Sequence, residues 1–360
     1  MRRNILTLGL ILIISVCCAQ KYKFGVICDT RSNADQSGVS GVNVAAVTAV
    51  CNHLKASGAK FIIAPGDFIC GNVKWYNAQQ TPPSNTQQLQ AFLGAAKSQG
   101  VSLPGEKGNI FIYPVRGNHE CYQDILPEDS VEAAWIKNIG YSLPKNGPAK
   151  EIGFTYSFEY NGSLFIGMDQ YMHSGLTKKD SIRVDQIWLN KELKNHPNAR
   201  QVFVYGHTPA FAAKHPDCLD DDSLARNIFI ESISNRSGVY FCGHDHFYAR
   251  GDIPVYAKNG IITKYMQQVI TPSGAPFLVG SKKWNGKYPN KDVKPEKFID
   301  NAVGYQLVTV NGKKVTVEFF ATFDACTITK DDQGNPVYTY NNNWQTWKFT
   351  KMDTFTFKLP

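Results

Sequence analysis

The sequence predicts a mixed α/β fold, and three observations carry this prediction. Short apolar runs typical of buried strands alternate with amphipathic segments typical of helices. Polar residues follow directly after several of these runs, at the strand ends where α/β sheets gather their ligands. After about residue 250, strand signals dominate and the chain closes in β-structure. With 360 residues, 43% of them hydrophobic, the chain can bury a large core, which excludes disorder as its main state.

The predicted elements follow in order along the chain. Six apolar runs predict buried strands, at residues 23–28, 60–64, 109–115, 164–168, 201–205 and 239–242. Segments between them predict helices at residues 40–56, 85–98, 130–138 and 183–194, the last with Val184, Ile187 and Trp188 on one face. Later strands are predicted at residues 304–310 and 314–320, around an Asn311-Gly312 hairpin turn, and at 354–358. Residues 70–85 and 122–130 are predicted loops at strand ends.

The first twenty residues have the layout of a secretory signal. Arg2 and Arg3 precede an apolar run over residues 5–16, which small residues follow up to Ala19. An uncleaved membrane anchor is the alternative, but the run is shorter than the ~20 residues that a spanning helix needs. We therefore expect a signal peptide over residues 1–19, no membrane span after its cleavage, and a secreted, extracellular or lysosome-like location.

The charge balance argues against a nucleic-acid or membrane-surface partner. The chain carries 38 Lys and Arg against 30 Asp and Glu, a formal net charge of +8, and loss of Arg2 and Arg3 with the signal leaves +6. This mild excess favours anionic substrates by long-range steering. No cluster of five or more Lys and Arg occurs, so we expect no nucleic-acid binding.

Cysteines and possible glycosylation sites bear on the same export route. Two of the nine cysteines fall within the signal, leaving Cys28, Cys51, Cys70, Cys121, Cys218, Cys242 and Cys326. An odd number in an oxidising compartment leaves at least one unpaired within the chain, bound to a metal or bridged to a partner. Asn161 and Asn235 each begin an Asn-x-Ser sequence and are predicted glycosylation sites if the export route is eukaryotic.

Metal-ligand residue types follow five of the predicted strands: Asp29, Gly66-Asp67, Gly117-Asn118-His119-Glu120, Gly206-His207 and Gly243-His244-Asp245-His246. Oxygen and imidazole donors suit Fe, Mn, Zn or Mg. There are too many of them for one tetrahedral ion and about enough for two ions that share a bridging carboxylate. On an extended backbone, His244 and His246 would point the same way. Each group alone is more often a turn, but five groups in this order predict a metal centre.

This ordered set is similar to that of the calcineurin-like metallophosphoesterases, and looks closest to their purple (tartrate-resistant) acid phosphatase branch. The resemblance runs from about residue 22 to 320. It implies a four-layer αββα sandwich of two mixed β-sheets flanked by helices. It also implies one metallophosphoesterase catalytic domain over residues 20–360, with a β-rich segment from about residue 300.

The resemblance also implies a ligand set for two metal ions, iron with iron, zinc or manganese. Asp67 would bridge both ions, and the remaining ligands would be Asp29 and His246 at the first position and Asn118, His207 and His244 at the second. His119 matches the family histidine that is not a ligand but binds the substrate and acts in catalysis. Glu120 either orients His119 or is an acid that lies at the surface or just behind the ligands.

The function that the resemblance implies is that of a secreted phosphatase acting on phosphate monoesters. Hydroxide bound to the two metal ions would attack phosphorus directly, without a covalent enzyme intermediate. We expect a small phosphorylated substrate and a monomeric enzyme. Two other readings stay open: a phosphodiesterase or nucleotidase with the same metal centre, and a secreted binding protein with a degraded first metal site.

Two positions depart from the family pattern. The purple branch has a metal-binding tyrosine three residues after the bridging aspartate, where this chain has Cys70. Other branches have a histidine two residues after the first aspartate, where this chain has Arg31. The first ion therefore lacks one ligand, and water or another side chain is favoured over Cys70 because cysteines are most often buried hydrophobes. Arg31 either reaches a substrate phosphate or forms a structural salt bridge.

Other hydrolase classes fit poorly. His119-Glu120 begins like a zinc-protease motif, but the residue four after His119 is Gln123 rather than a second histidine. Neither a GxSxG nucleophile elbow nor a GxxxxGK[ST] phosphate loop occurs in the sequence. Protease, serine-hydrolase and nucleotide-triphosphatase functions are therefore set aside.

Overall fold

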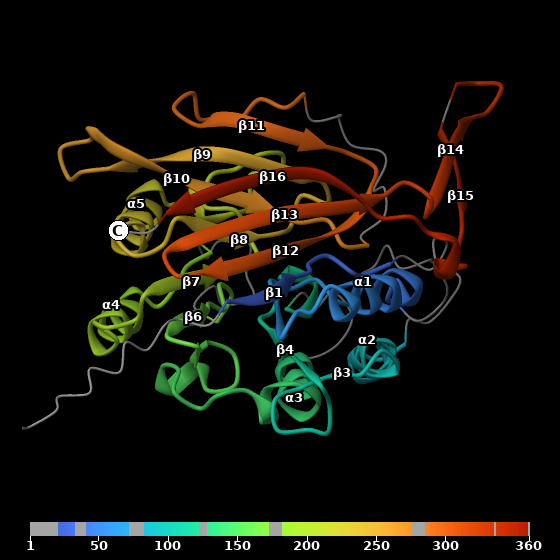
Figure 1. The fold of residues 1–360 in the computed structure, drawn as a ribbon, viewed down its shortest axis with the longest axis horizontal. Coiled ribbons are helices and arrows are strands. Elements are labelled where there is room, and N and C mark those ends of the chain that lie inside the picture. The colour runs from blue at the N-terminus through green and yellow to red at the C-terminus, as the bar shows by residue number, and fades with distance from the viewer. Residues whose placement is uncertain are drawn as a thin grey trace, which may run out of the picture.

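Two seven-stranded sheets pack face to face with helices on their outer sides (Figure 1). The computed structural model describes residues 21–32, 41–71, 83–121, 128–172, 182–274, 285–334 and 336–358. The predicted signal peptide over residues 1–19 lies outside them, as do residues 72–82 and 122–127 of the predicted loops. The four-layer αββα sandwich that the sequence led us to expect is confirmed.

The first sheet has the strand order β16-β13-β12-β1-β2-β4-β3. Its strands are β1 (Tyr22–Val26), β2 (Phe61–Ala64), β3 (Val101–Ser102), β4 (Ile110–Pro114), β12 (Val303–Asn311), β13 (Lys314–Thr322) and β16 (Thr350–Lys358). β1, β2 and β4 run parallel, whereas β12 pairs antiparallel with β1. The predicted Asn311-Gly312 hairpin is the β12–β13 turn, where Gly312 has a φ of 60°. The β-rich C-terminal segment thus completes the sheet that the N-terminal strand begins.

The second sheet has the order β11-β9-β10-β8-β7-β6-β5. Its strands are β5 (Tyr156–Tyr160), β6 (Ser163–Gly167), β7 (Gln201–Tyr205), β8 (Val239–Cys242), β9 (Tyr248–Tyr256), β10 (Ile262–Ile270) and β11 (Lys294–Ile299). The central strands β6, β7, β8 and β10 run parallel. A separate hairpin of β14 (Cys326–Lys330) and β15 (Pro336–Tyr340) lies apart from both sheets in Figure 1.

Helices cover the two outer faces. α1 (Val44–Ala56), α2 (Asn85–Ser98) and α3 (Glu128–Asn138) lie beside the first sheet, and α4 (Gln186–Asn195) and α5 (Ser223–Ser234) lie beside the second (Figure 1). Side-chain caps explain where α1 and α4 begin: Asn43 accepts a hydrogen bond from the Ala46 N–H, and Asp185 accepts one from the Trp188 N–H. α1 therefore starts later than predicted.

The predicted buried face of α4 was partly wrong. Val184 precedes the helix because Asp185 caps it, and Ile187 is 85% exposed. The buried side chains are instead Trp188, Leu189 and Glu192. Ile187 and Trp188 are neighbours in the chain, and neighbouring residues point about 100° apart around a helix. The two side chains therefore lie on different parts of the helix surface.

Two hydrophobic cores hold the layers together. In the first, the ring of Phe24 on β1 lies 5.1 Å from the rings of both Phe165 and Phe203 on the second sheet. This core fills the space between the sheets and the space beneath α1, α2 and α3. The second core packs α4 and α5 against the outer face of the second sheet, with Leu189 and Phe229 among its buried residues. In the part of the chain that the structure describes, no helix is both long and apolar enough to span a membrane.

Candidate metal centre

The five residue groups that follow predicted strands meet at one edge of the sandwich. They come after β1, β2 and β4 of the first sheet and after β7 and β8 of the second. The loops interlock through backbone hydrogen bonds: Asp29 N donates to Gly66 O at 3.0 Å, and Gly243 N donates to His207 O at 2.8 Å. Carboxyl ends of parallel strands from two facing sheets thus bring together all seven predicted site residues, Asp29, Asp67, Asn118, His119, His207, His244 and His246.

Four of these residues have left-handed backbone conformations. Their φ angles are 55° at Asp29, 56° at Asp67, 76° at His244 and 59° at His246. The prediction that an extended backbone presents His244 and His246 together was therefore wrong. Left-handed conformations cost about 1–3 kcal/mol each in a residue other than glycine and cluster at functional sites. Their concentration here indicates that the fold holds these side chains in place against a local cost.

A close approach between the loops after β2 and β4 requires a glycine at position 117. A side-chain carbon there would lie 2.1 Å from Asp67 Oδ1, well inside contact distance. The absence of that carbon lets the Asp67 carboxylate lie beside the loop that carries Asn118 and His119. The His119 N–H donates to Asp67 Oδ1 at 3.0 Å as a result.

The second metal position is built by Asp67, Asn118, His207 and His244. His207 Nε2 lies 2.9 Å from Asn118 Oδ1 and 3.4 Å from Asp67 Oδ1, and His244 Nδ1 lies 3.1 Å from Asn118 Oδ1. Atoms bound at ~2.1 Å to one ion are spaced by about 3.0–3.4 Å, so each of these three pairs has the spacing of two ligands of one ion. Asp217 Oδ1 lies 3.3 Å from the other ring nitrogen of His244, the position in which carboxylates orient metal-binding histidines.

A backbone carbonyl group, that of Pro65, orients His207 for metal binding. Its Nδ1 lies 2.8 Å from the carbonyl oxygen of Pro65, which assigns the proton to Nδ1 and points Nε2 toward Asn118 and Asp67. Burial by itself lowers the pKa of His207, but the charge and hydrogen bond of Asp67, together with the charges of Asp29 and Glu120, outweigh burial and raise the pKa to about 9. The surroundings of Nε2 therefore favour positive charge, which is what a metal ion would bring.

The first metal position has three candidate ligands. Ligand atoms of Asp29, Asp67 and His246 lie within 4.8 Å of one another. Asp29 Oδ1 and Asp67 Oδ2 are buried, and no hydrogen-bond donor among the described residues reaches either atom. Burial raises the pKa of Asp29, whereas His207, His119 and Arg31 together overcome burial and hold the pKa of Asp67 well below its usual range. Buried carboxylate oxygens without donors call for a cation.

A cationic side chain lies at this first position. The Arg31 Nε atom is 3.6 Å from Asp67 Oδ2, and its Nη2 atom is 3.3 Å from His246 Nε2. Arg31 is 2% exposed. The sequence left open whether Arg31 forms a salt bridge, and the structure places it in one with Asp67.

Cys70 and Cys28 lie beside the centre in different ways. The carbonyl oxygen of Cys70 lies 2.8 Å from His119 Nδ1, and the possible metal groups among the described residues do not include the Cys70 thiol. Cys28 does fall in one such group, with Asp29 and His207. Burial raises the pKa of Cys28 and keeps it a thiol, which donates to Pro65 O at 3.3 Å. The seven cysteines within the described residues are all buried.

His119 is held as a neutral imidazole at the edge of the centre. Its Nδ1 donates to Cys70 O, so Nε2 is the ring atom that faces the Asp67 carboxylate, 3.9 Å from Oδ2. Burial lowers the pKa of His119 to about 3, and the charge of Arg31 acts in the same direction.

Glu120 anchors backbone rather than His119. Its carboxylate accepts hydrogen bonds from the N–H groups of Asp67, Phe68, Ile69 and Gly117, at 2.7–3.1 Å. These charge-assisted bonds tie the loop after β2 to the loop after β4. Of the two roles that the sequence left open, the structure favours an acid beside the proposed ligands: Glu120 is buried and fixes the backbone that carries Asp67.

Sequence reasoning missed the residues that reach the centre from the loop after β7. The ring of His215 lies 5.1 Å from that of His244, and Asp217 contacts His244 as described above. Asp245 is buried and accepts hydrogen bonds from the N–H groups of Lys214 and His215, which holds this loop in place. The only sequence signal was a run of charged residues soon after Gly206-His207, which alone is typical of a solvated loop.

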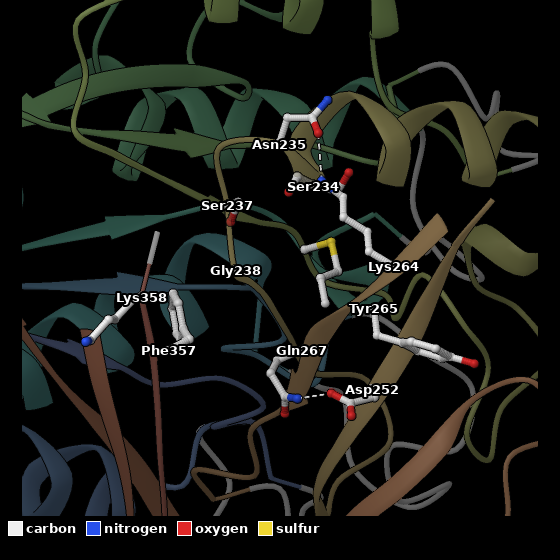
Figure 2. A pocket seen from close by; sticks show the side chains of 11 residues that line it. Ser234, Asn235, Ser237, Gly238, Asp252, Lys264, Tyr265, Gln267, Phe357 and Lys358 are labelled. Carbon is white, nitrogen blue, oxygen red and sulfur yellow. Dashed lines mark hydrogen bonds between the residues drawn. The ribbon is translucent and has the colours of Figure 1, made fainter. Parts of the chain in front are cut away.

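The predicted glycosylation sites lie away from the centre. Asn161 is exposed in the β5–β6 turn, with a φ of 50°. Asn235 borders a pocket of about 400 Å³ between the end of α5, β10 and β16, where its side-chain oxygen accepts a hydrogen bond from Lys264 (Figure 2). The serine of each Asn-x-Ser sequence has a structural role, since Ser163 and Ser237 are both buried and hydrogen-bonded.

Residues 23–248 match the calcineurin-like phosphoesterase family, a stretch that includes every residue of the centre. The chain belongs to this family. Among curated proteins, none matches this metallophosphoesterase. Members of the family are generally metal-dependent phosphoesterases, and this chain contributes candidate metal-binding groups in the expected place.

Three solved structures similar to this metallophosphoesterase show the breadth of the fold. PhoD has a TM-score of 0.60 at 12% identity, covering 94% of this chain and 70% of its own. A purple acid phosphatase from yellow lupin (Lupinus luteus) seeds has a TM-score of 0.55 at 12% identity, covering 95% and 54%. GAP50, the anchor in the inner membrane complex of Plasmodium, has a TM-score of 0.50 at 14% identity, covering 90% and 88%. At these identities the likeness extends to the fold alone, so the assignment to the purple branch stays a prediction.

Proposed function

We propose that this metallophosphoesterase is a secreted, metal-dependent phosphatase that hydrolyses phosphate monoesters, in the manner of the acid phosphatases. The observation that carries the proposal is the second metal position. There, His207 lies at ligand spacing from both Asp67 and Asn118, and His244 lies at ligand spacing from Asn118, beside a further histidine, His119. A binding protein without metal chemistry gains nothing from holding these groups together at buried, left-handed positions.

The donors at the second position suit a metal ion, because each pair given above has ligand spacing and all four side chains are buried. Asp67, Asn118, His207 and His244 would hold it, and iron, zinc and manganese all accept this mixture of oxygen and imidazole ligands. When bound, such an ion supplies Lewis-acid polarisation of the phosphoryl group and a nucleophile at neutral pH. The further proposed ligands, Asp29 and His246, belong to the first position, where the fit differs because Arg31 lies among them.

The chain's own residues would bind and orient the phosphate. His119 presents Nε2 toward the centre while Cys70 O fixes the other side of its ring, so the ring is held ready to contact a phosphoryl or leaving-group oxygen. Glu120 keeps the loop of Asp67 rigid. We include residues 20–360 in one catalytic domain that acts as a monomer on a small phosphorylated substrate.

The decisive experiment compares two chromogenic substrates on the full chain. We expect turnover of p-nitrophenyl phosphate that chelation abolishes and that added Mn²⁺, Zn²⁺ or Fe restores. His244→Ala should abolish it, whereas His196→Ala, at the end of α4 and away from the centre, should not. Turnover that survives both chelation and His244→Ala would refute the proposal. Faster turnover of bis(p-nitrophenyl) phosphate would replace it with the phosphodiesterase alternative.

Export is a separate part of the proposal and has its own test. Expressed in a eukaryotic cell, the full chain should appear in the medium or in a lysosome-like compartment with Gln20 as its first residue. Glycosidase treatment should lower its mass, and Asn161→Gln and Asn235→Gln together should remove that change. Retention of residues 1–19 in the mature protein would contradict the signal-peptide assignment.

A further inference from the structure

We propose that the guanidinium of Arg31 takes the place of the first metal ion, so that the chain holds a single ion, at the second position. The inference deepens the proposed function and rests on it, since it concerns the same centre. It departs from the two-ion centre that the family resemblance implied.

The guanidinium of Arg31 contacts two of the proposed ligands of the first ion. Arg31 approaches Asp67 Oδ2 with Nε at 3.6 Å and His246 Nε2 with Nη2 at 3.3 Å. Asp67 and His246 are two of the three candidate ligands of the first ion. The guanidinium therefore lies against the atoms that a first ion would have to contact.

The backbone fixes Arg31 in this position. Its N–H donates to the carbonyl oxygen of Asp67 at 3.1 Å, and it forms an isolated bridge with Val42. The side chain is only 3% exposed, so it is held among its neighbours rather than free in solvent. A first ion would have to share the buried space with this side chain or displace it.

Charge is the second argument. An arginine remains protonated in proteins, so the first position already holds a full positive charge beside the Asp29 and Asp67 carboxylates. A divalent ion placed among the same atoms would be repelled by the guanidinium at close range and in a buried setting, where screening is weak. The second position differs, because a negative group, the carboxylate of Asp217, lies 3.3 Å from the ring of its proposed ligand His244.

Arg31 can also serve the proposed reaction. A planar guanidinium matches the geometry of phosphate oxygens and can stabilise the charge that develops on them during transfer. No bond to Arg31 forms or breaks in this role. A single ion together with a fixed arginine would thus supply the positive charge that two ions supply elsewhere.

The test counts and characterises bound manganese. The full chain, freed of metal by chelation, is titrated with Mn²⁺, and bound metal is measured by elemental analysis and by electron paramagnetic resonance. We expect one Mn²⁺ per chain with the spectrum of an isolated ion. Two Mn²⁺ per chain with the spectrum of an exchange-coupled pair would overturn the inference, and so would the absence of bound metal.

Variants at position 31 sharpen the result. Arg31→His removes the cation and offers an imidazole, so we expect two ions and an exchange-coupled spectrum. Arg31→Lys keeps the charge and should still bind one ion, and His196→Ala should match the unmodified chain. An Arg31→His chain that folds, as judged by circular dichroism, yet still binds one ion would refute the role of Arg31. If that variant does not fold, the stoichiometry of the unmodified chain decides alone.

The same measurements separate this inference from the proposed function. One bound Mn²⁺ without turnover of p-nitrophenyl phosphate would refute the phosphatase and leave the assignment of Arg31 standing. Two coupled ions with turnover would leave the phosphatase standing and refute the assignment of Arg31.

Discussion

The two metal positions share Asp67 and the same strand-end loops, yet they differ in what surrounds the shared carboxylate. At the second position, Asn118, His207 and His244 point donor atoms at one another from three separate strand ends. At the first, His246 lies beside both Asp29 and Arg31. The fold supplies the placement in both cases, and the residue types decide whether a position favours a metal ion or already holds a cation.

If Arg31 takes the place of the first ion, as proposed, then family membership and a nearly complete ligand set do not fix the number of bound metal ions. A single residue two positions after Asp29 removes a possible ligand and adds a positive charge at the same place. In this fold, the chemistry of a site can therefore depend on a single residue type.

Loss of a ligand at the second position should lower metal affinity more than any other substitution considered below. His207→Ala removes a ligand whose orientation is fixed by Pro65 O, and we expect metal affinity to fall by more than ~100-fold, since even loss of an outer partner of a ligand costs about 10–100-fold. Isothermal titration with Zn²⁺ or Mn²⁺ measures the change. His196→Ala is the matched control, and equal affinities in the two variants would contradict the assignment.

His119→Asn tests a residue beside both positions that is not assigned as a ligand. We expect kcat for p-nitrophenyl phosphate to drop by roughly 10²–10⁴-fold, the usual contribution of a positioned acid or base. Metal content should stay the same as in the unmodified chain. A loss of bound metal equal to that in His207→Ala would place His119 among the ligands instead.

Glu120→Gln tests the backbone support that both positions share. The substitution removes the charge and one of the two acceptor oxygens that bind four N–H groups, so the free energy of unfolding should fall by about 1.5–3 kcal/mol. Chemical denaturation monitored by circular dichroism measures it, with Glu132→Gln on α3 as the control. Unchanged stability together with a kcat effect like that of His119→Asn would assign Glu120 to catalysis.

Substitution of Cys70, which occupies the place of the purple branch's tyrosine, should change metal binding least. Because its thiol falls outside the candidate metal groups of the described residues, Cys70→Ala should leave metal content unchanged. The iron-loaded protein should be colourless or nearly so, with or without the substitution. An intense visible band that disappears with Cys70→Ala would make the thiolate a ligand, and one that survives would point to another charge-transfer donor.

Much of the fold and of the centre could be predicted from sequence, because the site residues follow buried strands that are easy to recognise. The buried parallel strands are continuous apolar runs, and β2, β4, β7 and β8 lie within one residue of their predicted bounds. Because each site residue directly follows such a strand, its place at the common edge follows from topology. Helix α5 was not predicted from the sequence. Its exposed face carries two apolar residues, Leu224 and Ile228, at 70% and 43% exposure, so the spacing of apolar residues does not show one buried face.

Contacts between loops could not be predicted in this way. Residues such as Arg31, His215 and Asp217 lie in segments whose path depends on tertiary hydrogen bonds, for example those that the N–H groups of Lys214 and His215 donate to the Asp245 carboxylate. The same holds for Glu120, whose four partners come from two loops. Nothing in the local pattern of residues specifies those distances.

The most direct measurement of the account is an anomalous diffraction map from a crystal of the full chain grown with Mn²⁺. The account predicts one anomalous peak, within bonding distance of Asp67, Asn118, His207 and His244, with the guanidinium of Arg31 beside Asp67 and His246. Two peaks about 3.5–4 Å apart, the spacing of two-metal centres, with Arg31 turned away, would contradict the single-ion centre. A map without a peak at these residues would contradict the metal centre itself.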